Sequence, residues 1–178
     1  MSDLHQLAYE IGYNNSQVAL KHLFLHYYPR LLLFASYYIS SKDVCEEIVS
    51  DTFIAVWNKR KELASVQNLN SYIYTIVKNI AIDYYRKSDK EETIDFSEAD
   101  YLIKVHADPE TELISSELME RLNHAIEQLP EKCKMAFKLI RIHNLSYDEV
   151  ANIMNISKKT LEGHITLAIK RLRETMNI

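Results

Sequence analysis

The sequence is poor in the residues that break helices. Its 178 residues contain only two glycines and three prolines, namely Gly12, Gly163, Pro29, Pro109 and Pro130. A sheet protein needs many turns built from such residues, so we expect an all-helical fold. The two glycines also cannot form G-x-G-x-x-G or G-x-x-x-x-G-K, which excludes the common phosphate-binding loops of nucleotide enzymes.

Cysteines and long apolar runs are scarce as well. Cys45 and Cys133 have no C-x-x-C partner and no histidine at metal-ligand spacing, so we interpret them as buried thiols of a protein in a reducing compartment. No basic start precedes an apolar run, and no stretch of about twenty apolar residues occurs. We therefore expect a cytoplasmic protein with no membrane insertion, no metal and no cofactor.

Acidic residues outnumber basic ones, but unevenly along the chain. The net charge is −4 at pH 7. Residues 1–88 hold nine basic and eight acidic side chains, residues 89–120 two and eleven, and residues 121–178 ten and six. The overall acidity therefore hides a basic C-terminal part, and a basic surface there is the feature expected of a nucleic-acid binder.

Helical periodicity divides the chain into three parts. Apolar residues recur at helical spacing from about 16 to 87, fade into Asp, Glu and Ser, and return from about 113. The composition of the middle part is that of a flexible linker. We expect two small helical domains, 1–87 and 113–178, joined by an acidic flexible linker over 88–112.

A short helix is expected to begin near Tyr147. Ser146 and Glu149 have the spacing of a capping box, in which both side chains satisfy free backbone N–H groups. Val150, Ala151, Ile153 and Met154 give this helix an apolar face. Asn155 follows, where the chain needs a left-handed turn. Asn144, before the helix, is also turn-like.

A second helix is expected to follow, capped by Ser157. An apolar stripe would face the core, formed by Leu161, Ile165, Ala168 and Leu172. The opposite face is polar and basic, with Lys159, Glu162, Gly163, Thr166, Lys170 and Arg173, and with Lys158 and Arg171 at its margins. Short helix, turn and longer basic helix form the arrangement of a helix-turn-helix, whose second helix enters the DNA major groove. A solvated charged helix is the alternative.

The N-terminal part contains two further helical patterns. Over 44–62, apolar positions Ile48, Thr52, Phe53 and Val56 are expected inside, with Glu47, Ser50, Asp51 and Ile54 near the other side. Such an acidic edge favours a basic partner. Over 71–87 the inward residues are Ile73, Ile76, Val77, Ile80 and Tyr84, and the outer face offers Thr75, Lys78, Asn79 and Arg86.

Tyrosines are abundant in the second of these patterns. The sequence has twelve tyrosines in all, and the pattern interleaves basic residues with Tyr72, Tyr74, Tyr84 and Tyr85. Aromatic rings beside cations suit melted DNA, because bases stack on rings and cations bind phosphates. The alternative is that these tyrosines belong to the core, and we expect this for Tyr84.

Taken in order, these segments resemble the group IV, or extracytoplasmic-function, sigma factors of the sigma-70 family. The matching segments are FLHYYPRLLLFASYYI, EEIVSDTFIAVW and NLNSYIYTIVKNIAIDYYRK, which resemble region 2 of that family, and 122–173, which resembles region 4. The resemblance implies a non-enzymatic subunit that directs RNA polymerase to promoters and helps to open the DNA.

The resemblance also implies roles for individual residues. Glu47, Ser50 and Asp51 would contact the clamp helices of the polymerase β′ subunit. The minus-10 promoter element would be contacted by Asn68, Tyr72, Thr75, Lys78, Asn79 and Arg86, with one base turned out at the loop 65–71. The minus-35 element would be contacted by Ser157, Lys158, Lys159, Thr160, Glu162, Gly163, Thr166, Lys170, Arg171 and Arg173.

Further partners are implied in the same way. The acidic linker would lie toward the active-site cleft and RNA exit channel of the polymerase, a location that includes its β subunit. An anti-sigma factor would also be a partner, as is usual in this family.

Other classes of protein remain as alternatives. A helix-turn-helix repressor or activator with a helical dimerisation domain shares the C-terminal pattern but does not explain the acidic edge over 44–58. A sigma mimic that binds only anti-sigma proteins does not explain the basic face over 157–173. An enzyme could use the seven histidines, but no Ser/His/Asp, Cys/His or paired-carboxylate spacing indicates catalysis.

Overall fold

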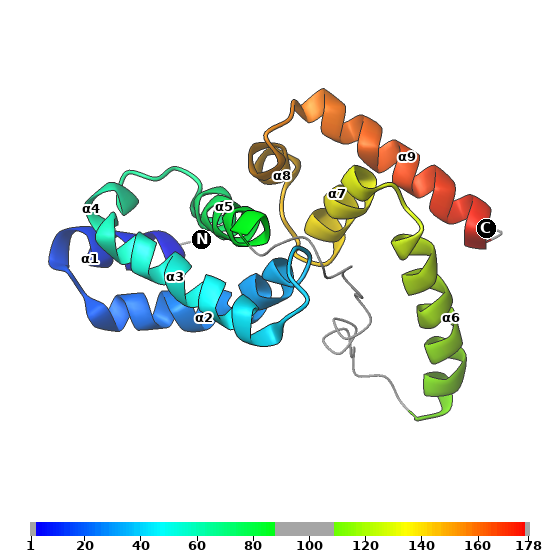
Figure 1. The fold of residues 1–178 in the computed structure, drawn as a ribbon, viewed down its shortest axis with the longest axis horizontal. Helices are drawn as coiled ribbons and strands as arrows, with labels where there is room; N and C mark the ends of the chain where they lie inside the picture. Colours follow the sequence, from blue (N-terminus) through cyan, green and yellow to red (C-terminus); the bar gives the residue numbers. More distant parts are fainter. Residues whose placement is uncertain (1–2, 88–108, 177–178) are drawn as a thin grey trace. The chain divides into compact units, whose positions relative to one another are not determined.

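The computed structural model describes residues 3–87 and 109–176, and every regular element in these two ranges is an α-helix (Figure 1). This confirms the expected all-helical fold. The chain divides into two compact units, Met1–Leu102 and Ile103–Ile178. Most of the expected acidic linker, residues 88–108, lies outside the described residues.

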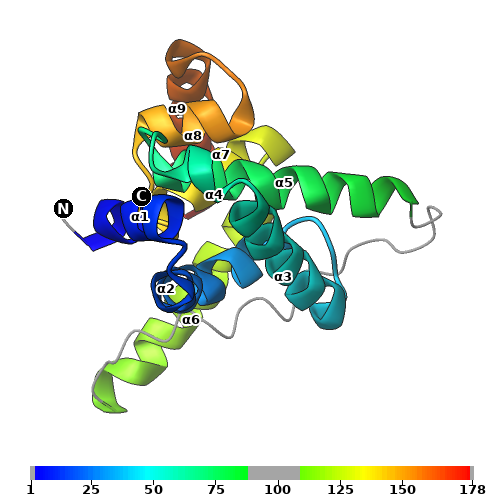
Figure 2. The same cartoon turned by 90° about the vertical axis from the view of Figure 1, so that its left-hand side faces the viewer.

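The described part of the N-terminal unit, residues 3–87, contains five helices. They are α1 (Asp3–Asn14), α2 (Gln17–Ala35), α3 (Lys42–Asn58), α4 (Arg60–Leu63) and α5 (Leu69–Lys87). In both views α3 lies against α5 (Figures 1 and 2). The acidic edge expected on α3 is therefore carried by a helix that belongs to the core.

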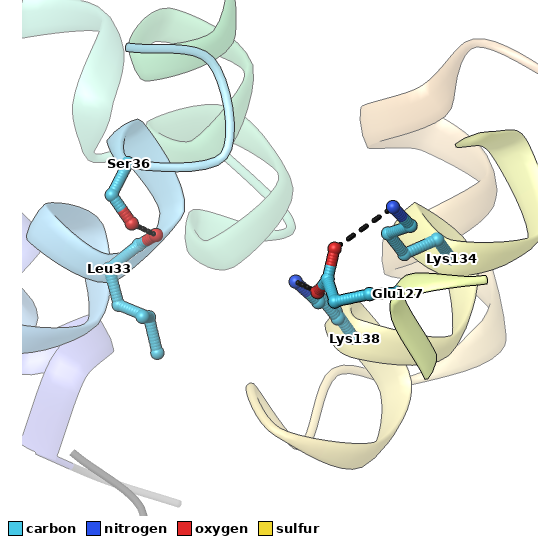
Figure 3. Close-up of polar contacts among 5 residues, drawn as sticks. All are labelled: Leu33, Ser36, Glu127, Lys134 and Lys138. Atoms are coloured by element: carbon cyan, nitrogen blue, oxygen red, sulfur yellow. Dashed lines mark hydrogen bonds and ion pairs between the residues drawn. The ribbon is translucent and has the colours of Figure 1, made fainter. Parts of the chain in front are cut away.

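Polar side chains define the ends of these helices. Asn15 takes a positive φ of 49° between α1 and α2, and the backbone N–H of Ala19 donates to the Ser16 hydroxyl at the start of α2. At the end of α2 the Ser36 hydroxyl donates to the Leu33 carbonyl oxygen at 2.7 Å (Figure 3). Side-chain oxygens thus satisfy backbone groups that a helix end leaves free.

The core of this unit is aromatic and aliphatic. Tyr27, Phe34 and Tyr74 are fully buried, and the rings of Phe34 and Tyr74 lie 5.0 Å apart. The hydroxyl of Tyr27 donates to Asn70 Oδ1 at 2.6 Å. A buried phenol therefore links α2 to the first turn of α5 without an unpaired polar atom.

Gly12 allows α1 and α4 to approach closely. A Cβ atom at this position would lie 2.8 Å from the Arg60 carbonyl oxygen and 3.0 Å from Ala64 Cβ. Arg60 also donates from Nε to Asn15 Oδ1, and its guanidinium lies 4.6 Å from the centre of the Trp57 ring. The short helix α4 is thus fixed against the end of α1.

The described part of the C-terminal unit contains four helices. They are α6 (Pro109–Glu127), α7 (Glu131–Arg141), α8 (Tyr147–Met154) and α9 (Lys158–Met176). Residues from α6, α7, α9 and the connection between α6 and α7 share one apolar cluster, made of Ala125, Ile126, Leu129, Cys133, Ala168 and Leu172. This cluster positions α9, the helix expected to enter the major groove.

One acidic side chain binds two lysines within this unit. Glu127, at the end of α6, lies 3.0 Å from Lys134 Nζ and 2.7 Å from Lys138 Nζ, both on α7 (Figure 3). Partial burial alone would raise the pKa of Glu127, but the hydrogen bonds and charges of Lys138 and Lys134 outweigh it, so the pKa is lowered.

Several expected boundaries differ from the structure. The pattern over 44–62 is not one helix. Lys59 has φ −100° and ψ 19°, which is not a helical conformation, and it separates α3 from α4. Helix α5 begins at Leu69 rather than 71, and α6 begins at Pro109, earlier than 113. The sequence pattern also gave no sign of α1 as a separate helix.

Within residues 3–87 and 109–176, no helix is long and apolar enough to cross a membrane. The same residues contain no group of three or more His, Cys, Asp or Glu side chains that could hold a metal ion.

Glu127 should make the stability of the C-terminal unit depend on pH. A carboxyl group with a lowered folded pKa stabilises the fold above its unfolded pKa, and this contribution is lost as the pH falls through the folded pKa. We expect Glu127→Gln to lower the melting temperature at neutral pH and to reduce the loss of stability between about pH 5 and pH 3. Calorimetry of the full chain measures both effects.

Glu174→Gln is the matched control for this experiment. Glu174 lies 3.9 Å from Lys170 in an exposed pair, and exposed pairs contribute little. Equal changes in the two variants would contradict a specific role for Glu127.

Candidate functional site

The turn between α8 and α9 has the geometry that the sequence predicts. The backbone N–H of Ser146 donates to Glu149 Oε2 at 2.7 Å, and that of Glu149 donates to the Ser146 hydroxyl at 3.3 Å. Asn155 then takes the left-handed conformation, with φ 54° and ψ 48°. The capping box, the helix start at Tyr147 and the left-handed turn at Asn155 are all confirmed. Asn144, predicted only as turn-like, has a positive φ of 52°.

The start of α9 is held by two hydroxyls. The backbone N–H of Thr160 donates to the Ser157 hydroxyl at 3.0 Å, and the hydroxyls of Ser157 and Thr160 lie 2.7 Å apart. Both residues were predicted to contact DNA. The structure places them at the helix N-terminus with their side chains engaged in the cap.

Helix α9 separates an apolar side from a polar one, as predicted. Leu161, Ile165, Ala168 and Leu172 are buried. All predicted contact residues along the opposite side are exposed, namely Lys158, Lys159, Glu162, Gly163, Thr166, Lys170, Arg171 and Arg173. The exposed side carries five cations, which is the charge expected of a surface that meets phosphates.

Contacts within the protein restrain some of these residues. Lys158 Nζ lies 3.0 Å from Asp148 Oδ1 and 3.1 Å from Oδ2, so it links the start of α9 to α8. The Thr166 hydroxyl donates to the Glu162 carbonyl oxygen at 2.8 Å.

Gly163 lies on the same exposed side of α9. A Cβ atom at Gly163 would meet nothing within 4 Å. The fold therefore has no packing reason for glycine at this position.

The buried side of α9 faces a cysteine on α7. Cys133 Sγ lies 3.7 Å from His164 Nδ1. Burial raises the pKa of the Cys133 thiol, an effect that the charge of Arg171 only partly offsets. Cys133 and Cys45 are both buried and free, which confirms their interpretation as buried thiols.

On α3 the buried and exposed sides also match the prediction. Ile48, Thr52, Phe53 and Val56 are buried, and the Thr52 hydroxyl donates to the Ile48 carbonyl oxygen. The opposite edge is exposed and consists of Glu47, Ser50, Asp51 and Ile54. We call these four residues the acidic edge.

A contact with the acidic edge corrects the prediction for two tyrosines. Tyr84 of α5 is not a core residue: it is half-buried, and its hydroxyl donates to Glu47 Oε2 at 3.2 Å. The charge of Glu47 is the largest cause of the raised pKa of Tyr84, and the charge of Asp51 adds to it. Tyr74, predicted as one of the interleaved aromatics, is fully buried instead.

The predicted minus-10 residues differ in their surroundings. Asn68 caps α5, because its Oδ1 accepts from the backbone N–H of Ser71 at 2.9 Å. Thr75 and Lys78 are half-buried, and burial lowers the pKa of Lys78. Asn79 and Arg86 are exposed, the latter 3.8 Å from Asp83.

The inward side of α5 matches the prediction in part. Ile73 and Val77 are buried, whereas Ile76 and Ile80 are half-buried.

Tyr72 carries a buried hydroxyl without a partner among the described residues. The remainder of its side chain is partly exposed. Burial, and then the charge of Glu62 on α4, raise the pKa of this phenol. Tyr72 directly follows the predicted minus-10 loop, residues 65–71, in the sequence.

Comparison with protein families identifies two matching models. The model described as sigma-70 region 2 matches residues 23–91, and the one described as sigma-70, region 4, matches residues 119–172. The first covers most of α2 and all of α3 to α5, and the second covers α7, α8 and most of α9.

Curated relatives match over most of the chain. The ECF RNA polymerase sigma-E factors of Salmonella typhimurium strain LT2 and Escherichia coli strain K12 are each 27% identical over 168 residues, covering 90% of this chain and 87% of the relative. The protein of the same name from Haemophilus influenzae is 27% identical over 136 residues, covering 72% of this chain and 71% of the relative.

Two solved structures share the fold. The structure of CnrH in complex with the cytosolic domain of CnrY has a TM-score of 0.66 and 18% identity, covering 99% of this chain and 98% of that one. The sigma factor RpoE in complex with the anti-sigma factor NepR from Bartonella quintana has a TM-score of 0.63 and 24% identity, covering 89% of this chain and 96% of that one.

Removing the unpaired hydroxyl of Tyr72 should not destabilise the protein. An unpaired buried hydroxyl costs about 1–3 kcal/mol, so Tyr72→Phe is expected to unfold at an equal or higher melting temperature. Tyr27→Phe is the matched control, because it removes a hydroxyl that bonds Asn70 and should cost about 1 kcal/mol. If both variants lose the same stability in thermal melts, the Tyr72 hydroxyl has a bonding partner after all.

Proposed function

The chain belongs to the extracytoplasmic-function group of the sigma-70 family, and from this premise we propose that it directs the bacterial RNA polymerase core enzyme to specific promoters and promotes DNA opening. The observation that carries the proposal is the order of the two matched regions along the chain. Region 2 coincides with helices that expose an acidic edge, and region 4 with a helix-turn-helix. The family consists of transcription regulators, and a non-enzymatic role follows for this chain.

The acidic edge of α3 is the proposed polymerase-binding surface. Glu47, Ser50 and Asp51 are all exposed on one rigid helix, where charged groups can meet the clamp helices of the β′ subunit. Charge complementarity at such a surface raises the rate of association and selects the partner.

The start and outer side of α5, with the preceding loop, form the proposed minus-10 surface. Exposed Asn79 and Arg86 can contact the melted strand directly. The half-buried residues of this surface would line the place taken by an extruded base. They are Asn68, Tyr72, Thr75 and Lys78. Extrusion costs a few kcal/mol, which contacts with the base must offset.

The exposed side of α9 is the proposed minus-35 surface. Lys159, Glu162, Gly163 and Thr166 lie where base edges would be read, whereas Lys170, Arg171 and Arg173 lie near the helix end, where cations bind phosphates. Ser157, Lys158 and Thr160 are held by contacts within the protein. Their contribution would therefore be to position the helix as well as to contact DNA.

An anti-sigma factor is a further proposed partner. The two solved structures with this fold are complexes, with the cytosolic domain of CnrY and with the anti-sigma factor NepR. Sequestration by such a protein would keep the chain from polymerase. We place the protein in the cytoplasm, where the polymerase acts, and the acidic linker near the β subunit and the RNA exit channel.

Reversing one charge of the acidic edge tests the proposal. Asp51→Arg should reduce binding to purified core polymerase by more than about tenfold, because a like-charge contact replaces an attraction at the interface. Asp51 is exposed, so the melting temperature should change little. Glu174→Arg, the same reversal on α9, is the control and should keep core binding.

The same proteins are then assayed for transcription with core polymerase on genomic fragments, with mapping of the start sites. Wild type should give discrete start sites that Asp51→Arg abolishes. A wild-type protein that fails to bind core polymerase, and instead binds a palindromic site as a dimer, would be a repressor or activator and would overturn the proposal.

Gly163 gives a separate test of the minus-35 surface. Glycine in an exposed helix interior costs about 1 kcal/mol relative to alanine, and an added Cβ meets nothing within the protein. Gly163→Ala should therefore raise the melting temperature but weaken binding to promoters with a minus-35 element, because the methyl group comes between α9 and the groove. Unchanged DNA binding in this stabilised variant would show that DNA does not approach α9 at Gly163.

A further inference from the structure

Tyr84 connects the two helices that carry the proposed polymerase-binding and minus-10 surfaces. It lies on α5, whereas Glu47 lies on α3, and the phenol oxygen is 3.2 Å from Glu47 Oε2. The two helices pack against each other (Figure 2). The hydrogen bond therefore joins the acidic edge to a helix that packs against α3.

Both acids of the acidic edge act on this tyrosine. Glu47 and Asp51 occupy positions i and i+4 of α3, which lie on one side of a helix. The phenol oxygen bonds Glu47 directly, and the charges of Glu47 and Asp51 both raise the pKa of Tyr84. The half-buried tyrosine and the two exposed acids thus form one group of side chains at the surface.

The hydroxyl orders a side chain that would otherwise be free to rotate. Glutamate has high rotamer entropy, and a partner that binds an exposed glutamate must order it. A carboxylate has about four lone-pair sites, so the bond from Tyr84 leaves acceptor sites on Glu47 for a second donor. Ordering before binding reduces the cost of association.

We propose that Tyr84 is a positioning residue for polymerase docking, which holds Glu47 beside Asp51 as a preformed site for an arginine side chain of the polymerase. Arginine fits this site better than lysine, because its planar guanidinium can donate to two acceptors and also stack on the tyrosine ring. The inference rests on the proposed function, since it concerns the same surface and the same partner.

Tyr84→Phe isolates the hydroxyl, because the variant keeps the ring. We expect the Kd for core polymerase to rise by about twofold to tenfold, the range that corresponds to ordering one long side chain. The melting temperature should change little, because the hydrogen bond itself is exposed to solvent. Tyr13→Phe removes the hydroxyl of an exposed tyrosine on α1 and should leave the Kd unchanged.

A double-mutant cycle separates positioning from direct contact. If Tyr84 acts through Glu47, then Tyr84→Phe has no further effect on the Kd in a Glu47→Ala background. Binding is measured at low ionic strength, where electrostatic attraction is strongest and a weakened complex stays measurable.

The outcomes distinguish this inference from the proposed function. If wild type binds core polymerase and Tyr84→Phe binds equally well, the positioning role is wrong while the proposed function stands. Losses that add in the double variant would show that Tyr84 touches the polymerase itself, which also overturns the inference. Failure of wild type to bind would instead remove the proposed function.

Discussion

Burial of α3 against α5 fixes where the surfaces of the N-terminal unit lie. Ile48, Phe53 and Val56 of α3 and Ile73 and Val77 of α5 are buried, and helical geometry then leaves the acidic edge of α3 and Asn79 of α5 exposed. A core substitution that rotated either helix would displace both surfaces at once. One packing arrangement therefore serves two proposed binding partners.

In the C-terminal unit, by contrast, local contacts set the ends of α8 and the start of α9. The capping box fixes the start of α8, the left-handed Asn155 ends it, and the Ser157 cap fixes the start of α9. The ion pair of Asp148 and Lys158 adds a contact across the turn. Residues that are close in sequence thus set the turn between α8 and α9, and the apolar cluster with α6 and α7 holds α9 in place.

This difference explains which features the sequence could predict. The capping box, the turn at Asn155 and the buried stripe of α9 involve residues a few positions apart, so spacing alone predicted them correctly. The exposed and buried sides of α3 followed from helical periodicity in the same way. The break at Lys59 did not, because α4 is fixed by contacts with α1 that are distant in sequence. Tyr74 and Tyr84 were assigned wrongly for a related reason: periodicity cannot tell a tyrosine that fills the core beside Phe34 from one that meets a carboxylate of another helix.

The close contact between Gly12 and the Arg60 carbonyl has a consequence for the proposed minus-10 loop. Helix α1 lies before residue 23, where the match to sigma-70 region 2 begins, yet it fixes α4, which leads directly into the segment before α5. A larger side chain at position 12 would displace α4 from α1 and, with it, the start of that segment. The proposed loop can thus be altered by a residue that does not itself contact DNA.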